Sequence, residues 1–176
     1  MSTPTLISVD EYLTTAYSPD VDYVDGTLEE RNEGEKPHSK AQRKLVLLIE
    51  KASGGKVCVW PEQRVQVRAT RYRVVDVCAT IGEPDEDIFT TPPFICIEVL
   101  SRRDSMTTIQ EKLDDYLGFG VPHIWILDPR RSKAYTYGPE GLVEIAQAFA
   151  GASSPAQGPF RVIQRSGSFK CSGKTA

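Results

Sequence analysis

Two apolar segments decide the fold: residues 72–81 (YRVVDVCATI) and residues 94–100 (FICIEVL). The second is a nearly continuous apolar run, which is typical of a central strand buried on both faces. Each segment contains one acid, Asp76 in the first and Glu98 in the second. An ionised carboxylate inside an apolar strand is costly unless it is paired, hydrogen-bonded or bound to a metal. These two acids are therefore the first candidates for a functional site.

Helical and extended patterns surround these segments in a mixed order. Helices are expected where apolar residues recur at helical spacing or a capping pattern occurs, at residues 6–16, 38–52 and 106–119. Further strands are expected at residues 56–60, 63–68, 123–127 and 134–137, with a hairpin at 23–30 around Asp25-Gly26. This order predicts an α/β (α+β) fold in which helices flank one mixed sheet.

The length of 176 residues fits one domain, and 40% hydrophobic with 26% charged residues is ordinary globular composition. We assign residues 1–150 to this domain and residues 151–176, rich in Gly, Ser, Pro and Ala, to a loosely structured tail. Apolar runs are too short for a membrane span, and no signal-peptide pattern opens the sequence. We therefore expect a cytoplasmic protein with no membrane partner.

Charge is segregated along the chain although the net charge is only −3. Residues 20–35 contain seven acids and a single base, Arg31, whereas residues 61–75 contain four arginines and a single acid, Glu62. A second basic cluster lies at residues 130–133. Such clusters are more often solvated faces than binding sites, so charge alone does not identify a nucleic-acid partner.

The two buried acids favour a shared cation, because two carboxylates on adjacent strands repel each other. Carboxylate oxygens are ligands that Mg²⁺ prefers, with water completing its coordination. The alternative is that each acid pairs with an arginine or faces solvent at a strand end. Lys112 lies at the border of the apolar face of helix 106–119 and could reach Glu98. It could equally cover apolar surface with its stem.

These residues resemble the PD-(D/E)XK nuclease superfamily, and more closely a bacterial family of restriction endonucleases within it. Seven segments carry the resemblance in the family's order over residues 6–137: SVDEYL (8–13), YVDG (23–26), PHS (37–39), YRVVDV (72–77), IEVLS (97–101), EKLDDY (111–116) and GVPHIWILDP (120–129). The usual lysine of the superfamily would stand at Leu100, and the usual proline before the aspartate at Val75. The chain is therefore similar to a migrated-lysine variant, in which Lys112 takes over the role.

The resemblance implies an endonuclease that hydrolyses phosphodiester bonds of DNA with Mg²⁺, for which Mn²⁺ could substitute. Asp76, Glu98 and the Val99 carbonyl would hold the metal, and Asp76, Glu98 and Lys112 would be catalytic. A homodimer would match the symmetry of a duplex, although no residue pattern indicates one.

Further residues are candidates by position. Ser101 is close to Glu98 in sequence, Glu62 lies on a strand expected beside Asp76, and His38 opens the first long helix, where an N-cap is the alternative. Phosphate contacts are expected from six arginines: Arg64, Arg68, Arg71, Arg73, Arg102 and Arg103. Two other functions stay open: an inactive nuclease-fold module that binds nucleic acid or protein, and an enzyme acting on a non-nucleic phosphate ester.

Overall fold

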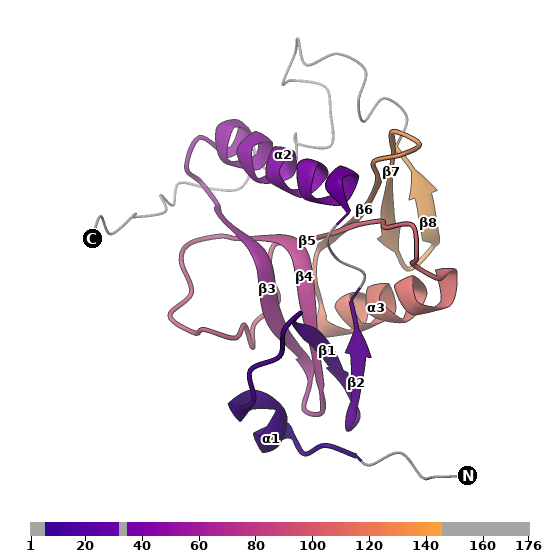
Figure 1. The fold of residues 1–176 in the computed structure, drawn as a ribbon. Helices are drawn as coiled ribbons and strands as arrows, with labels where there is room; N and C mark the ends of the chain where they lie inside the picture. Colours follow the sequence, from indigo (N-terminus) through magenta and orange to yellow (C-terminus); the bar gives the residue numbers. More distant parts are fainter. Residues whose placement is uncertain (1–5, 32–34, 146–176) are drawn as a thin grey trace.

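The computed structural model describes residues 6–31 and 35–145. Figure 1 shows the helices and strands of this part of the chain, which follow one another in the order α1 (Val9–Thr14), β1 (Val21–Val24), β2 (Thr27–Glu30), α2 (Lys36–Ser53), β3 (Cys58–Arg68), β4 (Arg71–Thr80), β5 (Ile95–Val99), α3 (Met106–Phe119), β6 (His123–Asp128), β7 (Lys133–Gly138) and β8 (Gly141–Glu144). The expected tail, residues 151–176, lies outside the described residues. None of the described helices is long and apolar enough to cross a membrane.

The strands form one mixed sheet, as the sequence predicts. Its order is β2-β1-β4-β5-β6-β7-β8, and β3 also pairs with β4. β5 and β6 are parallel, whereas the other pairs of neighbouring strands are antiparallel. A parallel pair needs a crossover connection, and α3 forms part of the connection between β5 and β6. The fold is therefore a mixed α+β architecture.

The two long helices cover opposite faces of the sheet (Figure 1). The apolar stripe of α2, which includes Leu45 and Ile49, packs on one face with Val77 and Ile97. Leu113 and Tyr116 of α3 pack on the other face with Cys78, among others. Neighbouring residues of β4 serve opposite faces because side chains alternate along a strand. Because a helix covers each face of the sheet, the central strand β5 is buried at all five positions, as its nearly continuous apolar run predicts.

One edge of β4 is shared by two different strands. Near its start, Arg71 and Tyr72 pair with β1, and further along, residues 77–79 pair with β5. Between them, residues 73–76 pair with neither strand in the described structure. Here the Val74 N–H donates to Asp22 Oδ1 (2.8 Å), and Lys112 Nζ donates to the Val74 carbonyl (2.9 Å). The sheet therefore forks at this point, and side chains take the place of a neighbouring strand as hydrogen-bond partners of the Val74 backbone.

Two strands differ from the expectation. The segments predicted as 56–60 and 63–68 form one strand, β3, because Glu62 adopts φ 51° and lets the chain continue past Pro61. Strand β8 was not predicted, since its short sequence GLVE carries little pattern. The hairpin around Asp25-Gly26 is confirmed, and both turn residues have the positive φ (49° and 93°) that this turn requires.

Candidate functional site

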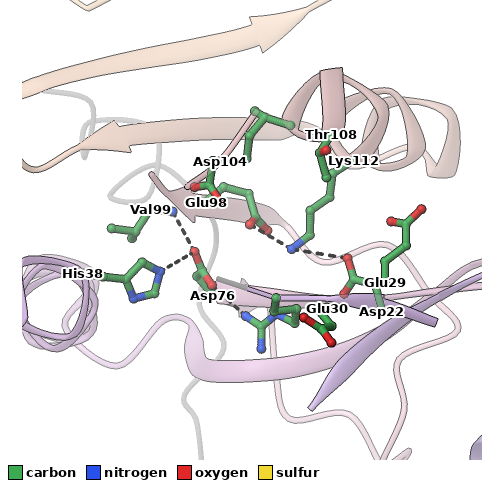
Figure 2. Close-up of a pocket in the computed structure, with 12 residues that line it drawn as sticks. Asp22, Glu29, Glu30, His38, Asp76, Glu98, Val99, Asp104, Thr108 and Lys112 are labelled. Carbon is green, nitrogen blue, oxygen red and sulfur yellow. Dashed lines mark hydrogen bonds and ion pairs between the residues drawn. The ribbon is translucent and has the colours of Figure 1, made fainter. Parts of the chain in front are cut away.

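A pocket lies at the fork of the sheet and is lined mainly by polar side chains (Figure 2). It collects residues from six elements and two loops: Asp22, Glu29, Glu30, Arg31, His38, Asp76, Glu98, Val99, Asp104, Thr108, Ile109 and Lys112. The structure thus brings the three predicted catalytic side chains, from β4, β5 and α3, to one place. Their catalytic role stays a prediction.

Asp76 and Glu98 occupy facing positions where β4 and β5 separate. The ladder pairs Cys78 with Cys96 and Val77 with Ile97, so the next facing pair would be Asp76 and Glu98. Instead of continuing the ladder, the Val99 N–H donates to Asp76 Oδ2 at 2.8 Å. Both side chains are buried, with 7% and 5% exposed. The carboxylates therefore sit side by side at the base of the fork.

Asp76 is held as a carboxylate by its neighbours. Arg31 donates to Oδ1 (2.8 Å), and His38 Nε2 lies 3.1 Å from Oδ2. Burial alone would raise the pKa of Asp76, but the hydrogen bond to His38 and the charges of Lys112, His38 and Arg31 outweigh it and lower the pKa. The same hydrogen bond to Asp76 raises the pKa of His38 above its ordinary value, against the effect of burial. His38 therefore contacts a candidate metal ligand, and it is not the N-cap of α2, a position that Glu35 occupies.

Glu98 has the opposite electrostatic character. Its Oε1 accepts a hydrogen bond from the Tyr116 hydroxyl (2.7 Å), and its Oε2 lies 3.0 Å from Lys112 Nζ. Burial raises the pKa of Glu98 to about 7, and the nearby charge of Asp76 acts in the same direction, whereas Lys112 and Tyr116 oppose the shift. A cation that entered the pocket would favour the ionised form of this acid.

Lys112 lies between acids of two strands, as Figure 2 shows. Its Nζ is 3.0 Å from Glu98 Oε2 and 3.7 Å from Asp22 Oδ2. Burial alone would lower the pKa of Lys112, but the charges of Asp22 and Glu98 outweigh it and raise the pKa. Lys112 is therefore a charged group aimed into the pocket, which excludes the alternative that it only covers apolar surface.

Seven residues of the pocket escaped sequence reasoning, and two of them, Arg31 and Asp22, contact the predicted catalytic residues. Arg31 bonds to Asp76 and also contacts Glu62, at 2.5 Å. Asp22 accepts the Val74 N–H, which no strand pairs with on that side. Arg31 carried a signal, because it is the single base in a stretch of seven acids. Glu62 does not line the pocket. It is 42% exposed and acts on Asp76 through Arg31 and through Gln42, which donates to Glu62 and to the Asp76 carbonyl.

Ser101 does not lie where the sequence suggested, because it is absent from the pocket lining. Its N–H donates to Asp104 Oδ2 (2.6 Å), and its hydroxyl oxygen accepts from the Arg103 N–H (3.3 Å). Ser101 therefore orders the loop after β5, of which Asp104 lines the pocket. The assignment of Ser101 to the reacting centre stays a prediction.

The arginines predicted to contact phosphates have different surroundings. Arg73 is 1% exposed and pairs with Asp22, Glu29 and Asp115, so its assignment to a nucleic-acid surface is wrong. Arg71 pairs with Asp25 and Asp115, and Arg64 pairs with Asp20. The acidic stretch 20–35 and the basic stretch 61–75 thus neutralise each other where β1 meets β4. Three of the predicted arginines have exposed side chains: Arg68, Arg102 and Arg103.

The donor set for a metal is small but chemically suitable. Within residues 6–31 and 35–145, no three His, Cys, Asp or Glu side chains converge as a metal site. Mg²⁺ needs fewer protein ligands, because it keeps several waters and is commonly held by one or two carboxylates. Asp76 and Glu98 fit that requirement. Val99 also lines the pocket, and its N–H already positions Asp76.

Comparison with known proteins agrees with this architecture. A crystal structure of a "putative nuclease" from Anabaena variabilis is similar, with a TM-score of 0.71 and 22% sequence identity over 85% of this chain and 90% of that chain. At this identity the likeness concerns the fold. None of the curated proteins matches the chain. The family model of Uma2, described as "Putative restriction endonuclease", matches residues 9–159. Because that match covers most of the sequence, the chain belongs to the Uma2 family.

Proposed function

We propose that the protein is a Mg²⁺-dependent endonuclease that hydrolyses phosphodiester bonds of DNA. The observation that carries this proposal is the convergence of Asp76, Glu98 and Lys112 in one polar pocket at the fork of the sheet. Membership of the Uma2 family supports a nuclease function. The family's description as restriction endonucleases favours DNA as the substrate.

The roles of the residues follow from their surroundings. Asp76 and Glu98, with the Val99 carbonyl, would hold Mg²⁺ (or Mn²⁺), which when bound polarises a phosphate and lowers the pKa of a coordinated water. Lys112 would orient the attacking water and offset negative charge that develops on the phosphate. His38 and Arg31 would fix the orientation of the Asp76 carboxylate, to which both bond.

We also propose a domain extent, a cellular location and an oligomeric state for the protein. We place residues 1–150 in one nuclease domain that acts in the cytoplasm. A homodimer would present two pockets to the two strands of a duplex. Size-exclusion chromatography with light scattering measures that state directly.

A second candidate function is an inactive nuclease-fold module that binds nucleic acid. The observation in its favour is that both carboxylates already have protein partners, with Arg31 and His38 on Asp76 and Lys112 and Tyr116 on Glu98. A pocket neutralised in this way can be stable without a metal.

Cleavage assays with purified variants separate the two functions. Supercoiled plasmid and labelled duplex are incubated with Mg²⁺, Mn²⁺ or EDTA, using wild type, Asp76→Asn and Lys112→Met. Glu111→Gln is the matched control, because Glu111 is an exposed neighbour of Lys112 on the same helix. We expect metal-dependent cleavage that falls by at least about 100-fold in both site variants and is unchanged in the control.

Two results would contradict the nuclease proposal. Cleavage that survives Asp76→Asn would place the activity outside this pocket. DNA binding by folded wild-type protein without cleavage under either metal would favour the binding module. Circular dichroism of each variant ensures that a loss of cleavage does not reflect unfolding.

A further inference from the structure

Four exposed arginines lie at the edge of the sheet where the two parallel strands end. β5 and β6 run in the same direction, so the loop after β5 and the turn after β6 leave the sheet at the same edge. The Leu100 N–H donates to the Leu127 carbonyl at 2.8 Å, which keeps the two segments adjacent. Each segment carries a pair of arginines, Arg102 with Arg103 and Arg130 with Arg131. We call these four residues the basic rim.

The arginines of the basic rim form no close ion pairs with described residues of the protein. Arg102 and Arg103 are exposed, and neither forms an ion pair with a described residue. Arg130 is 3.5 Å from Glu35, and Arg131, with 77% of its side chain exposed, is 3.8 Å from Asp128. Both contacts are longer than a charged hydrogen bond. The rim differs in this respect from Arg64, Arg71 and Arg73, whose guanidinium groups contact acids of other segments at 3.2 Å or less.

The backbone beneath the basic rim is well ordered. Ser101 and Asp104 bond across the first loop, and the Arg103 N–H donates to the Ser101 hydroxyl oxygen. In the second turn, Asp128 Oδ1 accepts from the N–H groups of Arg130 and Arg131, both at 3.0 Å. Fixed turns reduce the entropy that is lost when their side chains bind a partner. This arrangement presents guanidinium groups without fastening them to the protein.

The basic rim lies next to the mouth of the candidate site. Asp104, which follows Arg103 directly, lines the pocket, and so does Thr108 in the first turn of α3. Glu35, the contact of Arg130, is the N-cap of α2, whose third residue, His38, also lines the pocket. Figure 1 shows the start of α2 beside the end of β6. The rim and the pocket therefore share their bordering segments.

We infer that the basic rim is the surface on which the phosphate backbone of a nucleic acid lies as it enters the pocket. Guanidinium groups bind phosphate with paired hydrogen bonds, and for exposed guanidinium groups the free-energy cost of doing so is small. The inference rests on the proposed function for the identity of the partner. It replaces the β3–β4 arginines as the main source of backbone contacts, since most of those are committed to acids of the protein itself.

Salt dependence of DNA binding tests the inference. Fluorescence anisotropy of a short DNA duplex is measured in EDTA, where a metal-dependent nuclease cannot cut, across a series of NaCl concentrations. The variants are Arg102→Ser/Arg103→Ser and Arg130→Ser/Arg131→Ser. Each lost phosphate contact lowers the slope of log Kd against log salt by about 0.9. We expect each double variant to lower the slope by about 1.8 and to weaken binding about ten-fold at moderate salt.

A control variant removes the same charge elsewhere. Lys44→Ser/Lys51→Ser eliminates two exposed bases of α2, one near the middle of the helix and one in its last turn. We expect this control to keep the wild-type slope. The inference is overturned if the rim variants bind like wild type, if the control loses as much as they do, or if wild type does not bind DNA.

The DNA-binding measurement tests the inference separately from the question of whether the protein cleaves DNA. Binding that depends on the rim without cleavage in any metal keeps the inference and overturns the nuclease proposal. Metal-dependent cleavage with an unchanged salt slope in the rim variants does the reverse.

Discussion

Arg73 and Arg68 come from neighbouring strands of one hairpin, yet their side chains are 1% and 57% exposed. Arg73 lies beneath the hairpin β1–β2 and contacts Asp22, Glu29 and Asp115, all within 3.2 Å. Arg68 reaches only Asp115, at 3.7 Å. Removing a buried ion leaves its partners uncompensated, whereas an exposed ion pair contributes little. Residue type alone therefore does not determine what an arginine does here.

We predict that Arg73→Met lowers the free energy of unfolding by about 3–5 kcal/mol, because three acids then lose their buried cation. Arg73→Lys should recover only part of this loss, since an ammonium cannot reproduce the planar, forked contacts of a guanidinium. Urea denaturation monitored by circular dichroism measures both values. Arg68→Met is the control and should change stability by less than about 0.5 kcal/mol. An Arg73→Met protein as stable as that control would contradict the assignment.

At the scale of elements, α3 has a well-defined beginning and end. Ser105 accepts the Thr108 N–H at 3.0 Å as the N-cap, and Gly120 ends the helix with φ 97°. The Gly120 N–H bonds to carbonyls of the last turn, a geometry that a residue with a Cβ adopts only with strain. These ends set the position of Lys112 against Glu98, so helix boundaries that are readable from the sequence contribute directly to the site.

Two glycines near the end of α3 should respond oppositely to alanine. Gly118 lies inside the helix, and a Cβ there would meet only Arg68 Nη2 at 3.9 Å, so Gly118→Ala should stabilise the protein by about 0.5–1 kcal/mol. Gly120→Ala should destabilise it by about 1 kcal/mol or more, because the left-handed conformation is strained for alanine. Thermal and urea denaturation measure the signs. Equal effects of the two substitutions would show that the helix end is not formed as described.

Most elements were predictable because their signals are local. Apolar spacing marked α2 and α3, the apolar run marked β5, and Asp25-Gly26 marked the hairpin. The break expected between residues 60 and 63 is absent, because a single left-handed residue, Glu62, lets β3 continue. β3 pairs with β4 in one register on both sides of Glu62, and this pairing with a facing strand is what local patterns do not describe.

At the scale of the whole molecule, the fork between β1 and β5 creates the pocket. β4 changes partner along one edge, and its unpaired Val74 is satisfied by Asp22 and Lys112. Polar groups from α2, α3 and four strands thereby lie together in an otherwise apolar layer. A ligand that binds only this folded arrangement must stabilise it in proportion to its concentration.

We predict that Mg²⁺ raises the melting temperature of the wild-type protein. At a concentration about 100-fold above Kd, the stabilisation is about 2.7 kcal/mol. In a domain of this size that corresponds to roughly 5–10 °C. Asp76→Asn should abolish the shift, whereas Glu111→Gln should retain it, with NaCl matching the ionic strength in all samples. A shift of equal size in Asp76→Asn would place the bound metal elsewhere.

The amino-acid sequence was sufficient for the fold class, the main elements and the identity of Asp76, Glu98 and Lys112 as unusual residues. Buried acids and a lysine at the border of an apolar face stand out against their own neighbours, so a linear pattern reveals them. Only the tertiary structure showed that Arg31 and Asp22 belong to the site, and which arginines are buried in ion pairs and which are exposed. Those outcomes depend on which strands lie side by side: Arg31 meets Asp76 across 45 residues, and Arg73 meets Asp22 across 51. Pairing over such separations is a property of the sheet's topology, because burial and neutralisation are established only when distant segments pack together.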